Sequence, residues 1–157
     1  LLDRGINEDS IKLFKLGFAP KNSTFLFESI KQKQYNKDVI EKSGLFGRSN
    51  SKIYDRFRSR IMFPILNTSN KVIAFGGRVF GVEDPAKYMN SPETPLYHKS
   101  EVFYGLNFTR DAIRKENYAI LVEGYTDLIQ LFQAGIKKYP EGDNWIITKV
   151  IEEIKSE

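Results

Sequence analysis

Apolar residues recur at helical spacing in the first part of the chain. Within residues 1–18, Asn7 can cap a helix whose first turn holds two acidic residues, and Gly17 can end it. The same kind of spacing predicts helices at about 23–32 and 37–42. The opening of the chain is therefore predicted to be a series of short helices.

The pattern changes in the middle of the chain. The stretch RIMFPILNTSNKVIAFGGRVFG predicts two strands, at about 60–66 and 71–80, joined by the polar turn Asn67–Asn70. Apolar residues and glycines occupy both sets of alternating positions in the second strand, so we expect this hairpin to be covered on both faces. Residues 81–100 are polar and contain three prolines, which predicts an ordered loop.

A second change of pattern follows the loop. Helical spacing indicates a short helix near 107–115 and another at about 125–134, which Gly135 can end. Between them, the continuous apolar run 118–122 is typical of a strand buried on both faces. Helices and strands alternate irregularly, so the predicted fold class is α/β in the mixed α+β sense.

The stretch ILVEGYTD combines structure with chemistry. Glu123 stands at the carboxyl end of the predicted strand, where open α/β sheets bind their ligands. Gly124 allows a tight turn, and Asp127 falls in the first helical turn, near Glu123. Two such carboxylates suit Mg²⁺, which takes one or two of them with waters and phosphates. The alternative is that Asp127 only complements the helix dipole and Glu123 is a solvated loop acid.

Composition narrows the classes of protein. The 157 residues include no cysteine, which excludes a disulfide framework and a thiolate zinc site. No apolar run approaches the length of a membrane span and no signal-peptide pattern opens the sequence, so we expect a cytoplasmic protein without a membrane partner. Leucine stands first, so we expect a fragment of something longer. The net charge of +4 suits nucleic acid, and it equally suits a surface of solvated lysines.

Several separate stretches resemble the catalytic core of bacterial DnaG-type DNA primases. RIMFPI and AFGGRV are similar to the family's paired core strands, AKYMNSPETPLYHKS to its ordered loop, and LVEGYTD to the first acidic motif of the Toprim fold. DRGINEDSIKLFKLGFAP is similar to the segment that leads the core, and FYGL to a further short motif. The resemblance implies a basic amino-terminal subdomain with the β-hairpin at 1–100, the start of a Toprim-like subdomain at 101–136, and a tail of uncertain relation at 137–157.

The resemblance also implies roles for single residues. Glu123 corresponds to a metal-linked catalytic acid, with Asp127 as a second metal-binding carboxylate. The family lines its groove with residues that hold template and nucleotide phosphates, and the matching positions are Arg4, Arg78 and Lys87, with Asn90 in the same loop. Arginine offers a planar fork for phosphate and lysine a point charge. The two glycines before Arg78 allow a close approach to this strand.

Three further arginines alternate in DRFRSR. Arg56, Arg58 and Arg60 would share one side of an extended chain. They could form a stripe that faces phosphates, which makes Arg58 and Arg60 candidate nucleic-acid contacts. They could equally be a solvated strand edge that charges protect from aggregation.

The implied activity is synthesis of short RNA primers on single-stranded DNA during replication. It would use ribonucleoside triphosphates and Mg²⁺ or Mn²⁺ and would form an RNA–DNA hybrid. The replicative helicase would bind through a domain that is absent here. The alternatives are a non-catalytic module that binds single-stranded nucleic acid, and another Toprim enzyme, a nuclease or a topoisomerase.

One departure from the family concerns the metal site. A Toprim fold completes that site with an Asp-x-Asp pair, and no Asp-x-Asp occurs in the chain. Glu141 and Asp143 are flanked by Pro140 and Gly142, which indicates a turn rather than a strand end, so they are not accepted as substitutes. The chain is then a fragment, or its numbering bridges a missing region, or a divergent tail has replaced half of the fold. In each case we expect it to be incomplete as an enzyme on its own.

Overall fold

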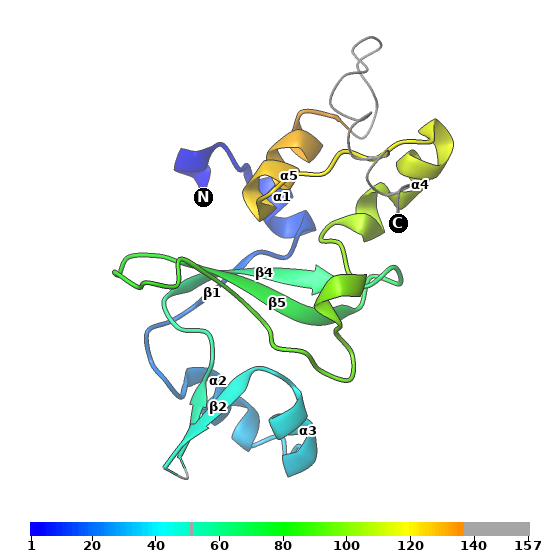
Figure 1. Ribbon diagram of the computed structural model, residues 1–157. Coiled ribbons are helices and arrows are strands. Elements are labelled where there is room, and N and C mark those ends of the chain that lie inside the picture. The colour runs from blue at the N-terminus through cyan, green and yellow to red at the C-terminus, as the bar shows by residue number, and fades with distance from the viewer. Residues whose placement is uncertain (51, 137–157) are drawn as a thin grey trace.

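The computed structural model describes residues 1–50 and 52–136, and an antiparallel sheet lies at its centre (Figure 1). The sheet has four strands in the order β1-β4-β5-β6, and every neighbouring pair is antiparallel. Its strands are β1 (Gly17–Ala19), β4 (Arg60–Leu66), β5 (Val72–Val79) and β6 (Tyr88–Asn90). The predicted hairpin is β4–β5, and it is confirmed.

One layer lies on each side of this sheet (Figure 1). The layer above it holds α1 (Glu8–Leu13), α4 (Leu106–Glu116), α5 (Tyr125–Gln133) and a 3-10 turn at Leu2–Arg4, and a second 3-10 turn, Lys99–Glu101, precedes α4. The layer below it holds α2 (Phe25–Lys31), α3 (Lys37–Lys42) and a second hairpin of β2 (Phe46–Ser49) and β3 (Lys52–Asp55). Helices and strands are both present, so the mixed fold class is confirmed. No helix of the described residues is long and apolar enough to cross a membrane.

The central strand β4 is buried at every residue except the half-buried Met62, as expected for a hairpin covered on both faces. Its residues Ile61 and Phe63 belong to the main core, where they meet Phe14 next to α1 and Ile129 of α5. We call this side of the sheet the helical face. In the turn that follows β4, Asn67 Oδ1 accepts hydrogen bonds from the backbone N–H groups of Ser69 and Lys71, both at 3.0 Å. Polar turn chemistry therefore sets the register of the hairpin.

The first helix begins as predicted and ends earlier. The Asn7 side chain accepts a hydrogen bond from the backbone N–H of Ser10 at 2.8 Å, so it is the cap. The helix ends at Leu13, and Lys15 adopts a left-handed φ of 53° that turns the chain toward the sheet. Gly17 does not stop the helix; it opens β1, whose backbone pairs with β4. A strand of three residues carries too little pattern to be seen in the sequence.

Helix α2 is capped by a distant residue. The Asp55 carboxylate at the end of β3 accepts hydrogen bonds from the backbone N–H groups of Leu26 at 2.6 Å and Phe27 at 3.0 Å. These donors have no partner inside the helix, and the helix dipole favours a negative charge there. The side chain that caps α2 therefore comes from the second hairpin, and it fastens that hairpin to the helix.

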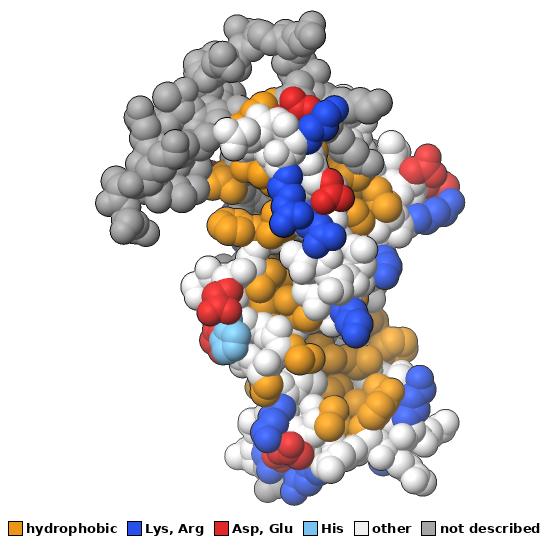
Figure 2. All heavy atoms as spheres, turned by 90° about the vertical axis from the view of Figure 1, so that its right-hand side faces the viewer, with side chains coloured by type: hydrophobic (Ala, Val, Ile, Leu, Met, Phe, Trp, Pro, Cys, Tyr) orange, Lys and Arg blue, Asp and Glu red, His pale blue; other side chains and the backbone are white. Residues whose placement is uncertain are grey.

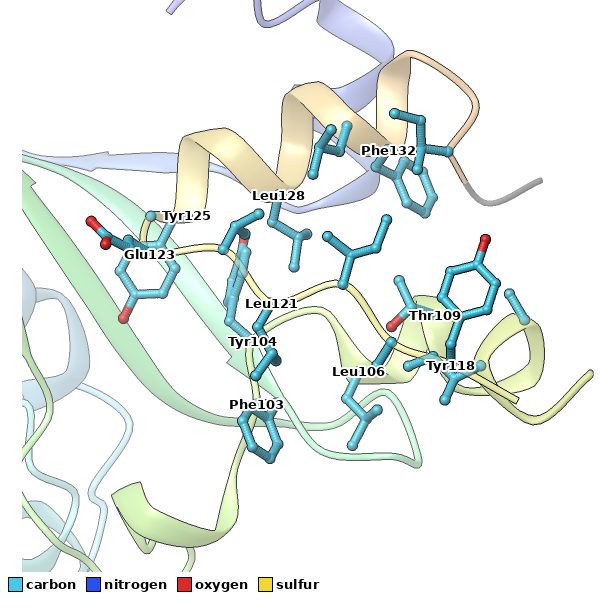
Figure 3. Close-up of a pocket in the computed structure, with 18 residues that line it drawn as sticks. Phe103, Tyr104, Leu106, Thr109, Tyr118, Leu121, Glu123, Tyr125, Leu128 and Phe132 are labelled. Carbon is cyan, nitrogen blue, oxygen red and sulfur yellow. The ribbon is translucent and has the colours of Figure 1, made fainter. Parts of the chain in front are cut away.

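The prediction of a buried strand at 118–122 is wrong for the described chain. This segment is extended but pairs with no described strand, and Ile120 and Leu121 are 39% and 47% exposed. A strand exists only where another strand satisfies its backbone N–H and C=O groups, and within residues 1–50 and 52–136 none lies beside it. The segment instead runs between α4 and α5 (Figure 3). The expected tail at 137–157 lies outside the described residues.

Candidate nucleic-acid and metal site

The two acids of ILVEGYTD lie where the chain turns into α5. Glu123 is exposed, Gly124 is the N-cap residue, and Asp127 stands in the first turn. A Cβ added at Gly124 would lie 2.8 Å from Asp127 Oδ2, so the Asp127 carboxylate folds back over the residue that follows Glu123. A side chain at position 124 would displace the Asp127 carboxylate from this place.

These carboxylates fit a divalent cation that is shared with a phosphate. Neither Glu123 nor Asp127 forms an ion pair within residues 1–50 and 52–136, so both charges are available. The described residues hold no group of three or more histidine, cysteine or acidic side chains that could enclose a metal. Mg²⁺ is commonly bound by one or two carboxylates, with waters and substrate phosphates as its other ligands.

Tyr125 connects this acidic turn to Asn90, the last residue of β6. Its hydroxyl donates a hydrogen bond to Asn90 Oδ1 at 2.7 Å. Its ring stacks on Phe63 with centroids 5.0 Å apart and meets the edge of Tyr104 at 4.7 Å. Burial, assisted by Tyr97, raises the pKa of Tyr125 to about 12, although the hydrogen bond to Asn90 lowers it. The hydroxyl therefore stays protonated and remains a donor at physiological pH.

Gly76 makes room for this tyrosine. It pairs with Asn90 across β5 and β6, and a Cβ there would lie 2.5 Å from Cε2 of Tyr125. Gly77 serves the opposite face, where a Cβ would lie 2.8 Å from Cδ1 of Phe57. The expected close approach to this strand is therefore real, and it involves two aromatic rings of the protein itself.

Arg78 lies on the same face as Gly76. Side chains alternate along a strand, so positions 76 and 78 point to the helical face. In the sheet register Arg78 pairs with Ile61 on one side and Tyr88 on the other, and its guanidinium lies 5.5 Å from the centroid of the Tyr88 ring. Lys87 directly precedes Tyr88 and is exposed. Arg78 and Asn90 therefore lie on one face of the sheet, and Tyr125 joins Asn90 to the acidic turn, while Lys87 directly precedes β6 at the edge of the sheet.

Arg4 lies beside the helix that carries Asp127. Its backbone carbonyl accepts a hydrogen bond from Nε2 of Gln130 at 2.7 Å, and Gln133 bonds the Gly5 carbonyl, also at 2.7 Å. These two glutamines of α5 hold the amino-terminal segment against the helix, and the exposed Arg4 side chain is left free to contact a ligand.

Comparison with known proteins identifies the family. The family model of the DNA primase catalytic core, N-terminal domain, matches residues 1–110. The chain belongs to the DnaG-type DNA primase family. The DNA primase of Rickettsia felis is 48% identical over 141 residues, which cover 88% of this chain and 23% of that protein. For the DNA primase of Enterococcus faecalis the identity is 43% over 143 residues, with shares of 87% and 23%. The chain therefore spans about a quarter of the length of these primases.

Solved primase structures have the same fold. The RNA polymerase domain of Mycobacterium tuberculosis primase DnaG, in complex with a double-stranded DNA oligomer with a 6-nucleotide overhang, matches with a TM-score of 0.82 and 34% identity. That match covers 87% of this chain and 43% of that one. The E. coli primase catalytic core matches with a TM-score of 0.74 and 37% identity over 87% and 44% of the chains. A DnaG primase catalytic domain bound to ssDNA matches with a TM-score of 0.73 and 38% identity over 87% and 43%.

In this member of the primase family, Arg60 does not lie with the candidate contacts. Its side chain is 2% exposed, and Nη2 contacts Asp84 Oδ2 at 2.6 Å while Nη1 donates to the Ala86 carbonyl at 2.8 Å. The expectation that Arg60 faces nucleic acid is corrected: it points to the opposite face of the sheet and anchors the loop after β5. Arg60 is buried because it pairs with Asp84, which lies 24 residues later in the sequence.

The predicted arginine stripe is also wrong as a shared surface. The residues before β4 are irregular, with Ser59 at a left-handed φ of 49°, so alternation does not hold. Arg56 is half-buried and Arg58 is exposed, with its guanidinium 5.3 Å from the centroid of the Tyr54 ring. Arg58 remains a candidate contact in the segment between β3 and β4, where it also donates a hydrogen bond to the Asp55 carbonyl.

The distribution of charge alone does not locate the candidate site. On the face drawn in Figure 2, lysine and arginine side chains are spread from top to bottom, with hydrophobic side chains gathered between them. A cavity of about 450 Å³ lies between α4, segment 118–124 and α5, but its lining is mostly apolar. Glu123 lies at one end of this cavity beside Tyr125 (Figure 3). The candidate site is therefore defined by contacts between particular residues.

Proposed function

We propose that this chain is the part of a primase that holds single-stranded DNA and supplies the first carboxylates of its metal site. The observation that carries the proposal is the hydrogen bond between Tyr125 and Asn90. It fixes the end of β6, which Lys87 precedes, beside the turn of Glu123 and Asp127, so that phosphate-binding cations and metal-binding acids would act on one ligand. The relatives in complex with DNA support DNA as that ligand.

Arginine, lysine and asparagine side chains would make different contacts with the DNA. Arg78 offers its guanidinium to template or nucleotide phosphates, while Tyr88 supports it from one side. Lys87 adds a point charge, and Asn90, held through its Oδ1 by Tyr125, keeps its amide N–H groups for a phosphate or a base edge. Arg4 would add a further cation from the segment that is held against α5.

Glu123 and Asp127 would hold Mg²⁺ or Mn²⁺. Bound there, the ion would neutralise the charge of a ribonucleoside triphosphate and help align a primer 3′-hydroxyl with the α-phosphorus. The chain's own part is to orient two carboxylates through the Gly124 turn and to keep the phosphates in place. A growing RNA–DNA hybrid would lie on the same surface. The helicase partner and the cytoplasmic location remain predictions for the longer primase.

We propose that the chain alone is an incomplete enzyme. It has two candidate metal-binding carboxylates but no Asp-x-Asp pair to supply the remaining ones. The test incubates it with single-stranded DNA, labelled ribonucleotides and Mg²⁺ or Mn²⁺. We expect DNA binding without template-dependent RNA synthesis. Robust synthesis would show that the site is complete as it stands, and absence of any DNA binding would refute the proposed role.

A non-catalytic module for single-stranded nucleic acid is the second candidate. It is favoured by the lack of a third acidic ligand among the described residues. The two candidates differ in their response to metal: only a primase segment needs Glu123 and Asp127 to bind Mg²⁺. Isothermal titration of Mg²⁺ into the chain, beside the Asp127→Asn variant, separates them.

A further inference from the structure

One end of the helical face of the sheet is left uncovered by the helices. A single row of cross-strand neighbours crosses this face, in the order Phe18, Ile61, Arg78 and Tyr88. Ile61 is buried in the core, whereas Phe18 and Tyr88 are 56% and 50% exposed. In Figure 1 the loop that follows β5 extends beyond the helices at the left of the view, at the same end.

A second exposed aromatic ring lies against Phe18. Phe80 follows the end of β5, two residues after Arg78, and it is 57% exposed. The two ring centroids are 6.0 Å apart at an interplanar angle of 85°. The rings meet edge to face and hold each other in place, while more than half of each stays in contact with water. Neither ring belongs to a core cluster.

The charges around this pair favour an anionic partner. Arg78 lies in the same row as Phe18, and the backbone carbonyl of Lys87 accepts a hydrogen bond from Val79, which places the lysine beside the strand end. The loop also holds two acids. Asp84 is paired with Arg60, which leaves Glu83 as the exposed negative charge. Exposed aromatic rings beside cations are the combination that binds single-stranded nucleic acid, because bases stack on the rings and phosphates meet the cations.

We propose that Phe18 and Phe80 form a stacking platform for an unpaired base of single-stranded DNA whose neighbouring phosphates are held by Arg78 and Lys87. This inference rests on the proposed function and adds recognition of a base to it. Because every base has an aromatic face, the platform accepts any sequence. A template strand would thereby be held at a fixed height above the sheet as it approaches Asn90 and the acidic turn.

The test compares two oligonucleotides of equal length and charge. One is a fluorescein-labelled oligothymidine, and the other carries abasic sites in place of the central bases. Anisotropy titrations at one low salt concentration use the 157-residue chain and its Phe18→Leu/Phe80→Leu variant. Leucine keeps an apolar side chain and removes the aromatic face. We expect the variant to bind oligothymidine about five-fold more weakly or worse, and to bind the abasic strand as the wild type does.

A matched control and a folding check accompany the titrations. Phe25→Leu changes a ring of similar exposure, 54%, on α2 on the far side of the sheet, and it should leave both affinities unchanged. Melting temperatures of all variants should agree within a few degrees. The double variant removes no charge, so its salt dependence should match that of the wild type.

Other outcomes would overturn the inference. An equal loss on both strands would mean that the rings support the fold and do not stack on bases. Unchanged affinity for oligothymidine, or a wild type that binds the abasic strand equally tightly, would mean that the rings serve another surface, such as an apolar face of a protein. If the wild type binds neither strand, the proposed function itself fails.

Discussion

The hydroxyl of Tyr125 lies 2.7 Å from Oδ1 of Asn90 and donates a hydrogen bond to it, across a sequence separation of 35 residues. This contact links the turn that carries Glu123 to the loop that carries Lys87. The candidate phosphate contacts and the candidate metal ligands are therefore linked by one hydrogen bond, and a change on one side of it should affect the other side.

Tyr125→Phe removes this bond while keeping the ring on Phe63. Asn90 would lose a partly buried partner, and we expect a loss of about 1 kcal/mol in the free energy of unfolding. Urea denaturation measures it. Tyr88→Phe is the control, because the Tyr88 hydroxyl is exposed and has no hydrogen bond among the described residues. Equal stability of the two variants would show that the bond contributes nothing.

The free energy of unfolding should also fall at alkaline pH because the Tyr125 hydroxyl ionises. Its pKa is raised from 10.0 to about 12, mainly by burial, so the folded protein retains a proton that the unfolded chain releases. The resulting stabilisation is complete below pH 10 and is lost as the pH rises toward 12. Urea midpoints between pH 9 and pH 11 should fall less steeply in Tyr125→Phe than in the wild type. Identical slopes would mean that the ring is solvated.

Gly76→Ala should disturb the hydrogen bond between Tyr125 and Asn90 by crowding the Tyr125 ring. The new methyl group would lie 2.5 Å from the Tyr125 ring, and the ring cannot move without leaving Phe63 and Asn90. We expect a loss of roughly 1–3 kcal/mol, as for other overpacked sites. Gly17→Ala is the matched strand control, because nothing lies within 4 Å of its Cβ position. Thermal melting measures both variants, and Gly76→Ala should melt at a lower temperature than Gly17→Ala. Coinciding melting curves would contradict this prediction.

Glu123→Gln should separate metal binding from folding. Glu123 is exposed, and no described residue forms an ion pair with it, so removal of its charge should leave the melting temperature without metal equal or slightly higher. Mg²⁺ should raise the melting temperature of the wild type more than that of the variant, because a ligand stabilises the state that binds it. Glu101→Gln, an exposed acid in a 3-10 turn, is the control. A variant that melts several degrees lower without metal would make Glu123 a structural residue.

The sequence predicted those elements whose pattern is long and local. The β4–β5 hairpin joins two apolar runs through a polar turn, and its pattern specifies strand, turn and register together. Strands of three or four residues, such as β1 and β6, have no periodicity to detect and exist because β4 and β5 offer open edges. The segment 118–122 shows the converse: a strand-like pattern forms no strand where no described neighbour pairs with it.

The site could be predicted only as far as residue type decides function. Glu123, Asp127, Arg78 and Asn90 follow from motif and position, and the structure brings them to one region. Arg60 has the same side chain as Arg78, yet it is buried because Asp84 and a backbone carbonyl from the next loop satisfy it. Partners this distant in sequence leave no local pattern.

The dependence of single-stranded DNA affinity on salt tests the central claim most directly. If Arg78 binds a phosphate, Arg78→Ala should weaken binding on all sequences alike and reduce the slope of log K against log salt by about one unit. Glu123→Gln should leave that slope unchanged, because this acid is assigned to the metal. An unaltered slope in Arg78→Ala would contradict the account, since the helical face of the sheet would then not be where this chain holds DNA.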